Sequence, residues 1–187
     1  VAHAPVFGAK VKSFDATAAK KVPGVVEVYQ IPTGVAVVAN NTWAARQGRD
    51  ALKVEWDSSK AEKRGSDQIM AEFRDAAAGK GPADLKWESF DTHGDASKAD
   101  GEIFEATYDF PYLAHATMEP MNAVARVKGN SVTMTFGSQI PTMDQLNAAK
   151  IVGTLPGAVQ IETLFAGGSF GRRGNFQSDY SAECVHI

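Results

Sequence analysis

The stretch AGGSFGRRGNF, residues 166–176, places four glycines and two adjacent arginines in one short segment. An alternating apolar run, AVQIETLF (158–165), precedes it, and a helix-like run, SDYSAECVHI (178–187), follows it. A strand, a glycine-rich loop and a helix in this order form a layout in which backbone N–H groups can face an anion or a cofactor. Glycine helps because it brings no Cβ between the backbone and a ligand. The loop is therefore the first candidate binding site.

The spacing of these glycines excludes two common phosphate-binding signatures. The loop reads Gly-Gly-Ser-Phe-Gly, and neither G-x-G-x-x-G nor G-x-x-x-x-G-K-[ST] occurs in it. Arg172 and Arg173 suit a phosphate or a carboxylate, and Phe170 is an unusual aromatic residue inside a glycine loop. From these residues alone, a flexible surface turn and a ligand-binding loop both stay open.

Composition indicates a globular chain of one medium domain or two small ones. It has 187 residues, of which 44% are hydrophobic and 22% charged, in the range of soluble proteins. The formal net charge of −3 gives no reason to expect a nucleic-acid partner, and no apolar run approaches the roughly 20 residues of a membrane span. A single cysteine, Cys184, excludes a disulfide or a multi-cysteine metal centre within the chain. No leader is visible at Val1, and cytoplasm and periplasm both stay open as compartments.

The first sixty residues predict a compact α+β unit. Alternating and β-branched residues predict strands at 6–14, 25–31, 35–39 and 52–57. A short helix is expected over 16–22, capped by Asp15, and another after residues 40–42. In the second helix Trp43, Gln47 and Ala51 recur on one face.

The middle of the chain predicts one helix and a long connection. The helix begins at Ser66, with an inner stripe of Ile69, Met70, Phe73 and Ala77. Residues 79–101 are rich in Gly, Asp, Ser and Lys and are expected to form a surface connection, with one short strand considered at 85–90. We place a domain boundary near Asp100-Gly101, which gives a first domain of residues 1–101 and a second of residues 102–187.

Residues 102–187 are expected to form several strands, one long helix and a final shorter helix. Alternation predicts a strand over EIFEATYDF (102–110), a hairpin of 122–127 with 131–136 turning at Gly129-Asn130, and a strand at 158–165. A helix is expected from Pro141, with a Thr142–Gln145 capping box, a stripe of Leu146, Ala149 and Val152, and a stop at Pro156-Gly157. A final helix is expected after a cap at Ser178 or Asp179.

Two polar segments are further site candidates. In LAHATMEPMNA (113–123), His115 and Glu119 are four residues apart, but HExxH is absent and no third metal ligand is apparent. We favour a buried turn there, with His115 or Glu119 hydrogen-bonded to the backbone, over a metal site. In FGSQIP (136–141), Gln139 lies between a strand end and a helix start, where polar side chains either face a site or cap the helix.

No nucleophilic catalytic arrangement is indicated. Ser169 lies in Gly-Gly-Ser-Phe-Gly rather than in G-x-S-x-G. Cys184 lies beside Ala182 and Val185 in the last helix-like run, and is interpreted as a small buried thiol. His3, His93 and His186 are scattered, and we expect surface or packing roles for them.

Three stretches stand together in order: PYLAHATMEPMNAVA (111–125), SQIP (138–141) and GGSFGRR (167–173). This combination resembles the molybdopterin-binding large subunit of the xanthine dehydrogenase and aldehyde oxidase family, most nearly the isoquinoline 1-oxidoreductase β-subunit type. Residues 9–29, 34–57 and 94–112 resemble that family's α/β-hammerhead domain. The resemblance covers nearly the whole chain and implies an α+β fold. It consists of a hammerhead-like domain followed by the first part of a molybdopterin-binding domain.

The resemblance implies a molybdenum hydroxylase, which adds a water-derived oxygen to an aldehyde or an N-heterocyclic aromatic substrate. It also implies a molybdopterin dinucleotide cofactor, expected in the cytosine form, and a small [2Fe-2S] partner subunit that receives the electrons. Gln139 would bond an oxygen ligand of molybdenum or the pterin, and the N–H groups of Phe170 and Gly171 would face the molybdenum ligands. Gly167 and Gly168 would permit that close approach, and Arg172 would reach the cofactor. Phe170 and Arg173 would border the substrate pocket.

Three departures limit what the resemblance implies. Ser169 stands where many relatives have glycine, and Gly174 stands where purine-oxidising relatives have glutamate, which argues against xanthine as substrate. The family's general-base glutamate lies in a Gly-x-Gly-Glu stretch that this sequence lacks. We therefore expect an early fragment that contains no catalytic residue, holds no cofactor by itself and is inactive alone.

Two alternatives stay open. One is a non-catalytic protein-interaction module of the same architecture. The other is phosphate or nucleotide binding through the two arginines of the loop.

Overall fold

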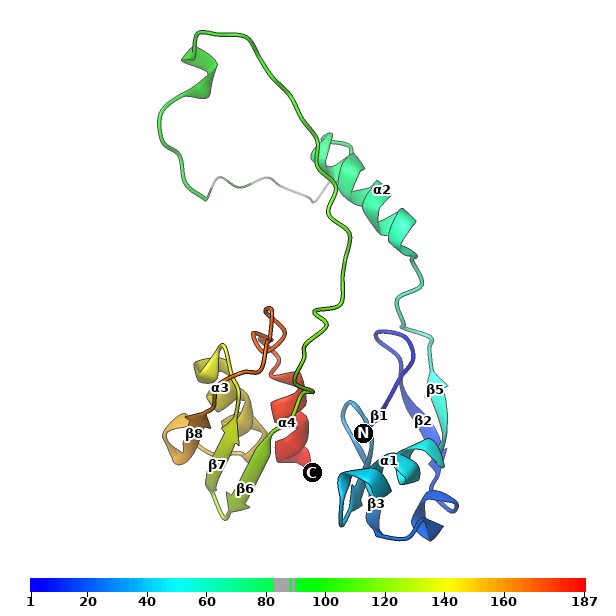
Figure 1. Ribbon diagram of the computed structural model, residues 1–187. Helices are drawn as coiled ribbons and strands as arrows, with labels where there is room; N and C mark the ends of the chain where they lie inside the picture. Colours follow the sequence, from blue (N-terminus) through cyan, green and yellow to red (C-terminus); the bar gives the residue numbers. More distant parts are fainter. Residues whose placement is uncertain (83–87, 89) are drawn as a thin grey trace. The chain divides into compact units, whose positions relative to one another are not determined.

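The computed structural model describes residues 1–82, 88 and 90–187, and divides into two compact units (Figure 1). The first unit combines Val1–Glu62 with His115–Ile187, and the second is Lys63–Ala114. Helices and strands are both present, as the sequence predicts. All the candidate site residues named above belong to the first unit. No helix within the described ranges is long and apolar enough to cross a membrane.

The N-terminal part of the first unit contains two small antiparallel sheets. One has the order β1 (Ala2–His3), β4 (Gly34–Ala39), β3 (Val25–Ile31), and the other pairs β2 (Lys10–Asp15) with β5 (Lys53–Asp57). The strand predictions here are confirmed, although β2 begins later than predicted. The run 35–39 contains no exposed residue, as its continuous apolar character predicts.

Helix α1 (Thr42–Asp50) packs on the β1-β4-β3 sheet through its smallest residues. The Asn41 side chain caps it by accepting a hydrogen bond from the N–H of Ala44 at 2.9 Å. Ala44 and Gly48 are its buried residues, and a Cβ at Gly48 would lie 2.7 Å from the Val25 side chain. Trp43 is 64% exposed, so the predicted face of Trp43, Gln47 and Ala51 is not the face that packs on the sheet. Small residues bury because they let the helix backbone approach the strands closely.

The short helix predicted over 16–22 is reduced to a 3-10 turn, η1 (Ala19–Lys21). Asp15 Oδ1 accepts the N–H of Thr17 at 2.8 Å, so the predicted acid does stabilise the turn that follows β2. Ala19 is fully buried with Val28 and Val35, and these three residues form the core of this part.

The site-bearing part of the first unit is built on a three-stranded sheet of order β6-β7-β8. Strands β6 (Val124–Lys128) and β7 (Ser131–Phe136) form the predicted hairpin, with Lys128 opposite Ser131. Strand β8 (Val159–Thr163) runs parallel to β7, and α3 (Pro141–Val152) is the crossover between them. Helix α4 (Asp179–His186) follows the glycine loop, as predicted.

Helices α3 and α4 contact each other and the sheet, α3 through β8 and α4 through β6. The core between these layers combines buried side chains from β7, β8 and both helices: Val132, Met134, Phe136, Ala148, Ala149, Val159 and Val185. The Phe136 ring meets the Tyr180 ring edge-on, with centroids 5.8 Å apart. This contact joins the last residue of β7 to helix α4.

Helix α3 departs from its sequence prediction in two respects. Its N-cap position is Ile140 and no side chain caps it, so the Thr142–Gln145 capping box is wrong. Gln145 instead donates from Nε2 to the carbonyl of Val159 at 2.9 Å, which ties the helix to β8. Leu146 is 44% exposed, whereas Asp144, Ala148 and Ala149 are buried. The helix ends at Gly153, whose φ of 75° is the left-handed conformation of a helix C-terminus, before Pro156 is reached.

The second unit contains α2 (Ser66–Ala77), with no buried residue, and a 3-10 turn η2 (Ala96–Lys98). The helix is confirmed, and Phe73 from its predicted stripe contacts Tyr112 with ring centroids 6.2 Å apart. The strand predicted over 102–110 is wrong, because these residues form no ladder. Alternation produces a strand only where a neighbouring strand accepts and donates the backbone hydrogen bonds. The strand considered at 85–90 falls mostly outside the described residues, and the division at residue 101 stays a prediction.

Candidate functional site

Strand topology brings the two predicted site segments together. Because β7 and β8 are parallel neighbours, both end at the same edge of the sheet, where ligands of open α/β sheets commonly bind. Gln139 follows β7 and the glycine loop follows β8. Gln139 Oε1 accepts the N–H of Arg173 at 3.2 Å, and the Gln139 N–H donates to the Arg173 carbonyl at 3.3 Å. Gln139 thus lies against the downstream end of the loop.

The backbone of the loop adopts left-handed conformations at three positions. Gly168, Phe170 and Gly171 have φ values of 85°, 52° and 94°. A positive φ costs glycine little but is strained for a bulky residue such as phenylalanine. The Phe170 side chain is 70% exposed, and its ring lies over Gly168, where a Cβ would come within 3.3 Å of it. The loop therefore holds an aromatic ring outward at a conformational cost.

The middle of the loop presents consecutive N–H groups. Its flanking amides are satisfied: Gly168 donates to Ala166, Arg172 to Ser169, and Gly174 to Gly171, at 2.9 to 3.0 Å. Within the described residues, the N–H groups of Ser169, Phe170 and Gly171 donate to no acceptor. Three adjacent free donors on a loop can together bind the oxygen or sulfur atoms of an anionic group.

Arg173 lies behind the loop and is buried. Its side chain is 1% exposed, with Nη2 3.2 Å from Glu119 Oε2 and the guanidinium 5.9 Å from the centroid of the Tyr180 ring. Gly137 makes room for it, since a Cβ there would lie 3.3 Å from Arg173 Nη1. None of its guanidinium nitrogens forms a hydrogen bond of good geometry with the described residues. The pair with Glu119 therefore supplies its charge compensation.

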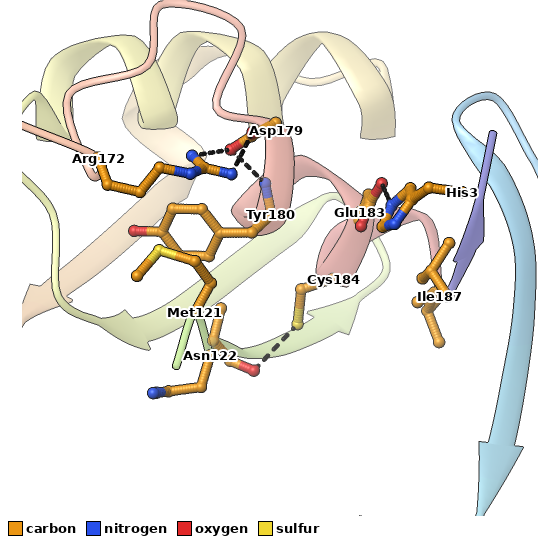
Figure 2. A pocket seen from close by; sticks show the side chains of 11 residues that line it. His3, Met121, Asn122, Arg172, Asp179, Tyr180, Glu183, Cys184 and Ile187 are labelled. Carbon is orange, nitrogen blue, oxygen red and sulfur yellow. Dashed lines mark hydrogen bonds and ion pairs between the residues drawn. The ribbon is translucent and has the colours of Figure 1, made fainter. Parts of the chain in front are cut away.

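Arg172 forms a two-pronged ion pair with Asp179 (Figure 2). Its Nη1 and Nη2 donate to Asp179 Oδ1 at 3.1 Å and Oδ2 at 2.7 Å. This hydrogen-bonded carboxylate raises the pKa of Arg172. The side chain keeps about a third of its surface, 31%, exposed, along a pocket that Tyr180 and Cys184 also line. Asp179 thereby connects the loop to the first turn of α4.

Glu119 forms two hydrogen bonds with Gly167 at the start of the loop and one with Asn122. Its Oε2 accepts the N–H of Gly167 at 2.6 Å, its own N–H donates to the Gly167 carbonyl at 3.2 Å, and Oε1 accepts from Asn122 Nδ2 at 2.9 Å. The hydrogen bonds from Asn122 and Gly167 lower the pKa of this carboxyl group. The prediction that Glu119 bonds the backbone is confirmed, although the segment is more exposed than a buried turn.

His115 and Glu119 do not share a helical face. Residues 113–123 form no helix, and no group of three His, Cys, Asp or Glu side chains within the described ranges could hold a metal ion. The imidazole of His115 instead lies beside the loop, 3.7 Å from where a Cβ of Gly171 would be. This neighbour of the loop was missed from sequence, where His115 was considered as a partner of Glu119 or of the backbone.

A buried carboxylate supports the turn before Gln139. Asp144, 4% exposed, accepts from the Ser138 hydroxyl at 2.5 Å and from the Ser181 hydroxyl at 2.9 Å. It thereby joins the residue next to Gln139 to helix α4. An acid in the first turn of a predicted helix suggests a dipole interaction, so the sequence contained no signal of this network.

Cys184 is a half-buried thiol that donates from Sγ to the carbonyl of Ala123 at 3.3 Å (Figure 2). Burial raises the pKa of this thiol. A thiol with a raised pKa is a poor nucleophile near neutral pH. The interpretation of Cys184 as a packing residue agrees with this environment.

Comparison with curated proteins finds relatives over most of the chain. The chain is 33% identical over 182 residues to the isoquinoline 1-oxidoreductase subunit beta of Brevundimonas diminuta, which covers 90% of the chain and 22% of the relative. It is 28% identical over 176 residues to a membrane-bound aldehyde dehydrogenase [pyrroloquinoline-quinone] of Gluconacetobacter polyoxogenes, over 90% of the chain and 23% of that protein. The chain thus spans less than a quarter of the length of these relatives.

The fold has a solved counterpart. The crystal structure of quinoline 2-oxidoreductase from Pseudomonas putida 86 matches with a TM-score of 0.61 at 16% identity, over 98% of the chain and 28% of that protein. The model of the molybdopterin cofactor-binding domain matches residues 79–186, which is more than half of the chain and includes Gln139, Glu119 and the glycine loop. The chain therefore belongs to the molybdopterin cofactor-binding domain family.

Proposed function

We propose that Gln139 and the loop of residues 167–171 form part of the wall that holds a molybdenum-bearing molybdopterin cofactor. The observation that carries this proposal is the run of free N–H groups at Ser169, Phe170 and Gly171, held beside Gln139 at the edge where β7 and β8 end. The membership of the chain in the molybdopterin cofactor-binding domain family supports it.

The residues present fit such a group. Gly167 and Gly168 bring the backbone forward without side chains, and the three free donors suit the oxygen and sulfur atoms of an anionic ligand. The ion pair with Asp179 leaves Arg172 partly exposed, so this arginine is the one we propose to reach the cofactor. Arg173, being buried, would shape the substrate side of the wall from behind, with Phe170 exposed in front of it.

The bonds of Gln139 decide which of its atoms is available to a ligand. Its Oε1 accepts the Arg173 N–H, which leaves the Nε2 hydrogens free to donate to an oxygen. The backbone N–H groups of Phe170 and Gly171 would donate from the loop side. The cofactor, when bound, supplies the redox chemistry, and the chain supplies orientation and fixed hydrogen-bond donors.

For the whole protein, we propose a molybdenum hydroxylase that oxidises an aldehyde or an N-heterocyclic aromatic with water-derived oxygen. The names of the two curated relatives, an isoquinoline oxidoreductase subunit and an aldehyde dehydrogenase, support these substrate classes. We extend the proposal to a [2Fe-2S] partner subunit, to the cytosine dinucleotide form of the cofactor, and to a hammerhead-like domain over residues 1–101. The 187-residue chain alone is proposed to be inactive, since it lacks the Gly-x-Gly-Glu stretch.

Metal and pterin analysis of the full-length gene product, made in a host that synthesises the cofactor, tests the proposal. We expect molybdenum and a pterin nucleotide near one equivalent, and at least a tenfold lower content in the Gln139→Ala variant. A Gln177→Ala variant is the matched control, because Gln177 is exposed near the same loop. Wild-type protein without molybdenum would overturn the proposal and favour a non-catalytic module.

An assay with isoquinoline or an aldehyde and a dye acceptor tests the activity itself. Turnover by the full-length product is expected, and turnover by the 187-residue chain alone would contradict the proposed inactivity. Nucleotide release from the denatured protein identifies the dinucleotide form. Thermal stabilisation of the chain by a free nucleotide would instead point to the arginines as a nucleotide site.

A further inference from the structure

The glycine loop is held from behind by an ion pair whose two members come from separate segments. Glu119 lies in the segment before β6, and Arg173 lies at the downstream end of the loop. The carboxylate accepts the N–H of Gly167 at 2.6 Å and lies 3.2 Å from Arg173 Nη2. One side chain therefore contacts the first residue of the loop and a side chain at its end.

Both members of the pair depend on a missing Cβ. A Cβ at Gly167 would lie 2.8 Å from Glu119 Cβ and Oε2, closer than real contacts allow. A Cβ at Gly137 would lie 3.3 Å from Arg173 Nη1. Two glycines thus leave room for the two charged side chains, of which Arg173 is buried and Glu119 keeps 36% of its side chain exposed.

Arg173 needs this partner for its charge. Its side chain is 1% exposed and its guanidinium forms no well-aligned hydrogen bond with the described residues. The acidic neighbour of its Nη2 is Glu119, while the Tyr180 ring covers its face. A buried cation without its counter-charge is strongly destabilising, so the position of Arg173 depends on Glu119.

We infer that Glu119 is a positioning residue that sets the conformation of the loop and so directs the free N–H groups of Phe170 and Gly171 toward their ligand. This inference rests on the proposed function of the loop for its ligand, but the geometric statement stands on the contacts alone. Glu119 fixes the upstream end through Gly167 and the downstream end through Arg173. The intervening donors remain unpaired because neither anchor uses them.

Amide hydrogen exchange measured by mass spectrometry on the full-length protein tests the geometric part. The Glu119→Ala variant removes both side-chain anchors. In peptides covering 166–173, we expect the hydrogen-bonded amides of Gly167, Gly168, Arg172 and Arg173 to exchange about tenfold faster or more. Glu119→Gln keeps one acceptor oxygen for the Gly167 N–H, but loses the charge and the second acceptor, which serves Asn122 Nδ2. Its rates should fall between those of Glu119→Ala and wild type. Glu162→Gln is the matched control at an exposed position of β8, where Glu162 accepts, among the described residues, only from the Thr135 hydroxyl at 3.2 Å.

Measuring Glu119→Gln in a second background, Arg173→Met, tests whether Glu119 acts through Arg173. In Arg173→Met the buried cation is absent, so Glu119→Gln should change loop exchange by less than about twofold there, against a clearly larger change in the wild-type background. Equal effects of Glu119→Gln in both backgrounds would overturn the coupling. Wild-type exchange rates in Glu119→Ala would overturn the positioning role.

Molybdenum content measured on the same samples connects the geometry to the ligand. Retention should follow the order wild type, Glu119→Gln, Glu119→Ala, with at least a tenfold loss in the last and no change in Glu162→Gln. Full retention in Glu119→Ala despite fast loop exchange would overturn the ligand-directing role. Wild-type protein without molybdenum, with loop exchange still responsive to Glu119→Ala, would overturn the proposed function and leave the geometric role of Glu119 standing.

Discussion

Gln139 and Arg173 are joined by two hydrogen bonds, from the Arg173 N–H to Gln139 Oε1 at 3.2 Å and from the Gln139 N–H to the Arg173 carbonyl at 3.3 Å. This pairing fastens the end of the glycine loop to the segment between β7 and α3. It also fixes the side-chain amide with its oxygen toward the protein. The following expectations test this arrangement and its supports.

Replacement of Gln139 by alanine should affect ligand binding far more than stability. The side chain is exposed and contributes one hydrogen bond to the backbone, worth about 1 kcal/mol or less in the free energy of unfolding. Urea denaturation followed by circular dichroism measures that change. A loss above about 3 kcal/mol would show that Gln139 serves the fold instead of the ligand.

Acid should release the loop through Glu119. Its pKa is lowered in the folded state, chiefly by the hydrogen bonds from Asn122 and Gly167. A carboxyl group with a lowered pKa stabilises the folded state fully above its ordinary value of 4.5, and this contribution is lost as the pH falls through the lower folded-state value. Loop exchange, corrected for the intrinsic pH dependence of amide exchange, should therefore accelerate below about pH 4.5 in wild type.

The matched variant for this pH dependence is Glu119→Gln, which has no carboxyl group to protonate. Its corrected loop exchange should stay flat over the same acidic range. A flat wild-type profile would show that protonation of Glu119 does not release the loop, and an equal acceleration in both proteins would assign the acid response to other carboxylates.

Alanine at Gly167 should displace the loop from Glu119. The added Cβ would lie 2.8 Å from the Glu119 side chain, and crowding of this kind costs about 1–3 kcal/mol in the free energy of unfolding. Gly157→Ala is the control, because nothing lies within 4 Å of a Cβ there. Equal unfolding midpoints for the two variants would mean that the contact between Gly167 and Glu119 is not maintained in solution.

Loss of the Asp144 carboxylate should destabilise the layer of α3 and α4. In Asp144→Ala the hydroxyls of Ser138 and buried Ser181 lose their acceptor, at a cost of about 2–4 kcal/mol. The surface variant Asp75→Ala should stay within about 0.5 kcal/mol of wild type. Chemical denaturation of both variants checks the difference, and similar curves would contradict the structural role of Asp144.

Local patterns in the sequence predicted much of the site-bearing fold. Alternation and the Gly129-Asn130 turn predicted the hairpin of β6 and β7, because register in a tight hairpin is set by neighbouring residues. The strand, loop and helix around residues 167–171 followed from the same kind of local evidence. The parallel pairing of β7 with β8 was not predicted, since a strand pattern does not identify its partner.

The errors and omissions share one physical cause, which is that they depend on contacts between residues far apart in the sequence. The capping box at Thr142 failed because Gln145 bonds Val159 from another strand, and the strand at 102–110 failed because it lacks a paired neighbour among the described residues. Glu119 and Arg173 were singled out separately, but their pairing depends on the tertiary fold. The sequence did contain one signal for this pair. Glu119 is an acidic residue, and the glycine loop contains two adjacent arginines with which an acid can pair.

The extended segment 102–113 of the second unit should affect how the purified chain behaves in solution. Ile103, Phe104, Phe110 and Leu113 are each at least 80% exposed, and the segment forms no backbone ladder with the described residues. An apolar, strand-like segment with open backbone groups favours association between molecules. The apparent molar mass of the purified 187-residue chain, measured by light scattering, should accordingly rise with concentration. Charged substitutions at Phe104 and Phe110 should suppress this self-association without affecting the glycine loop.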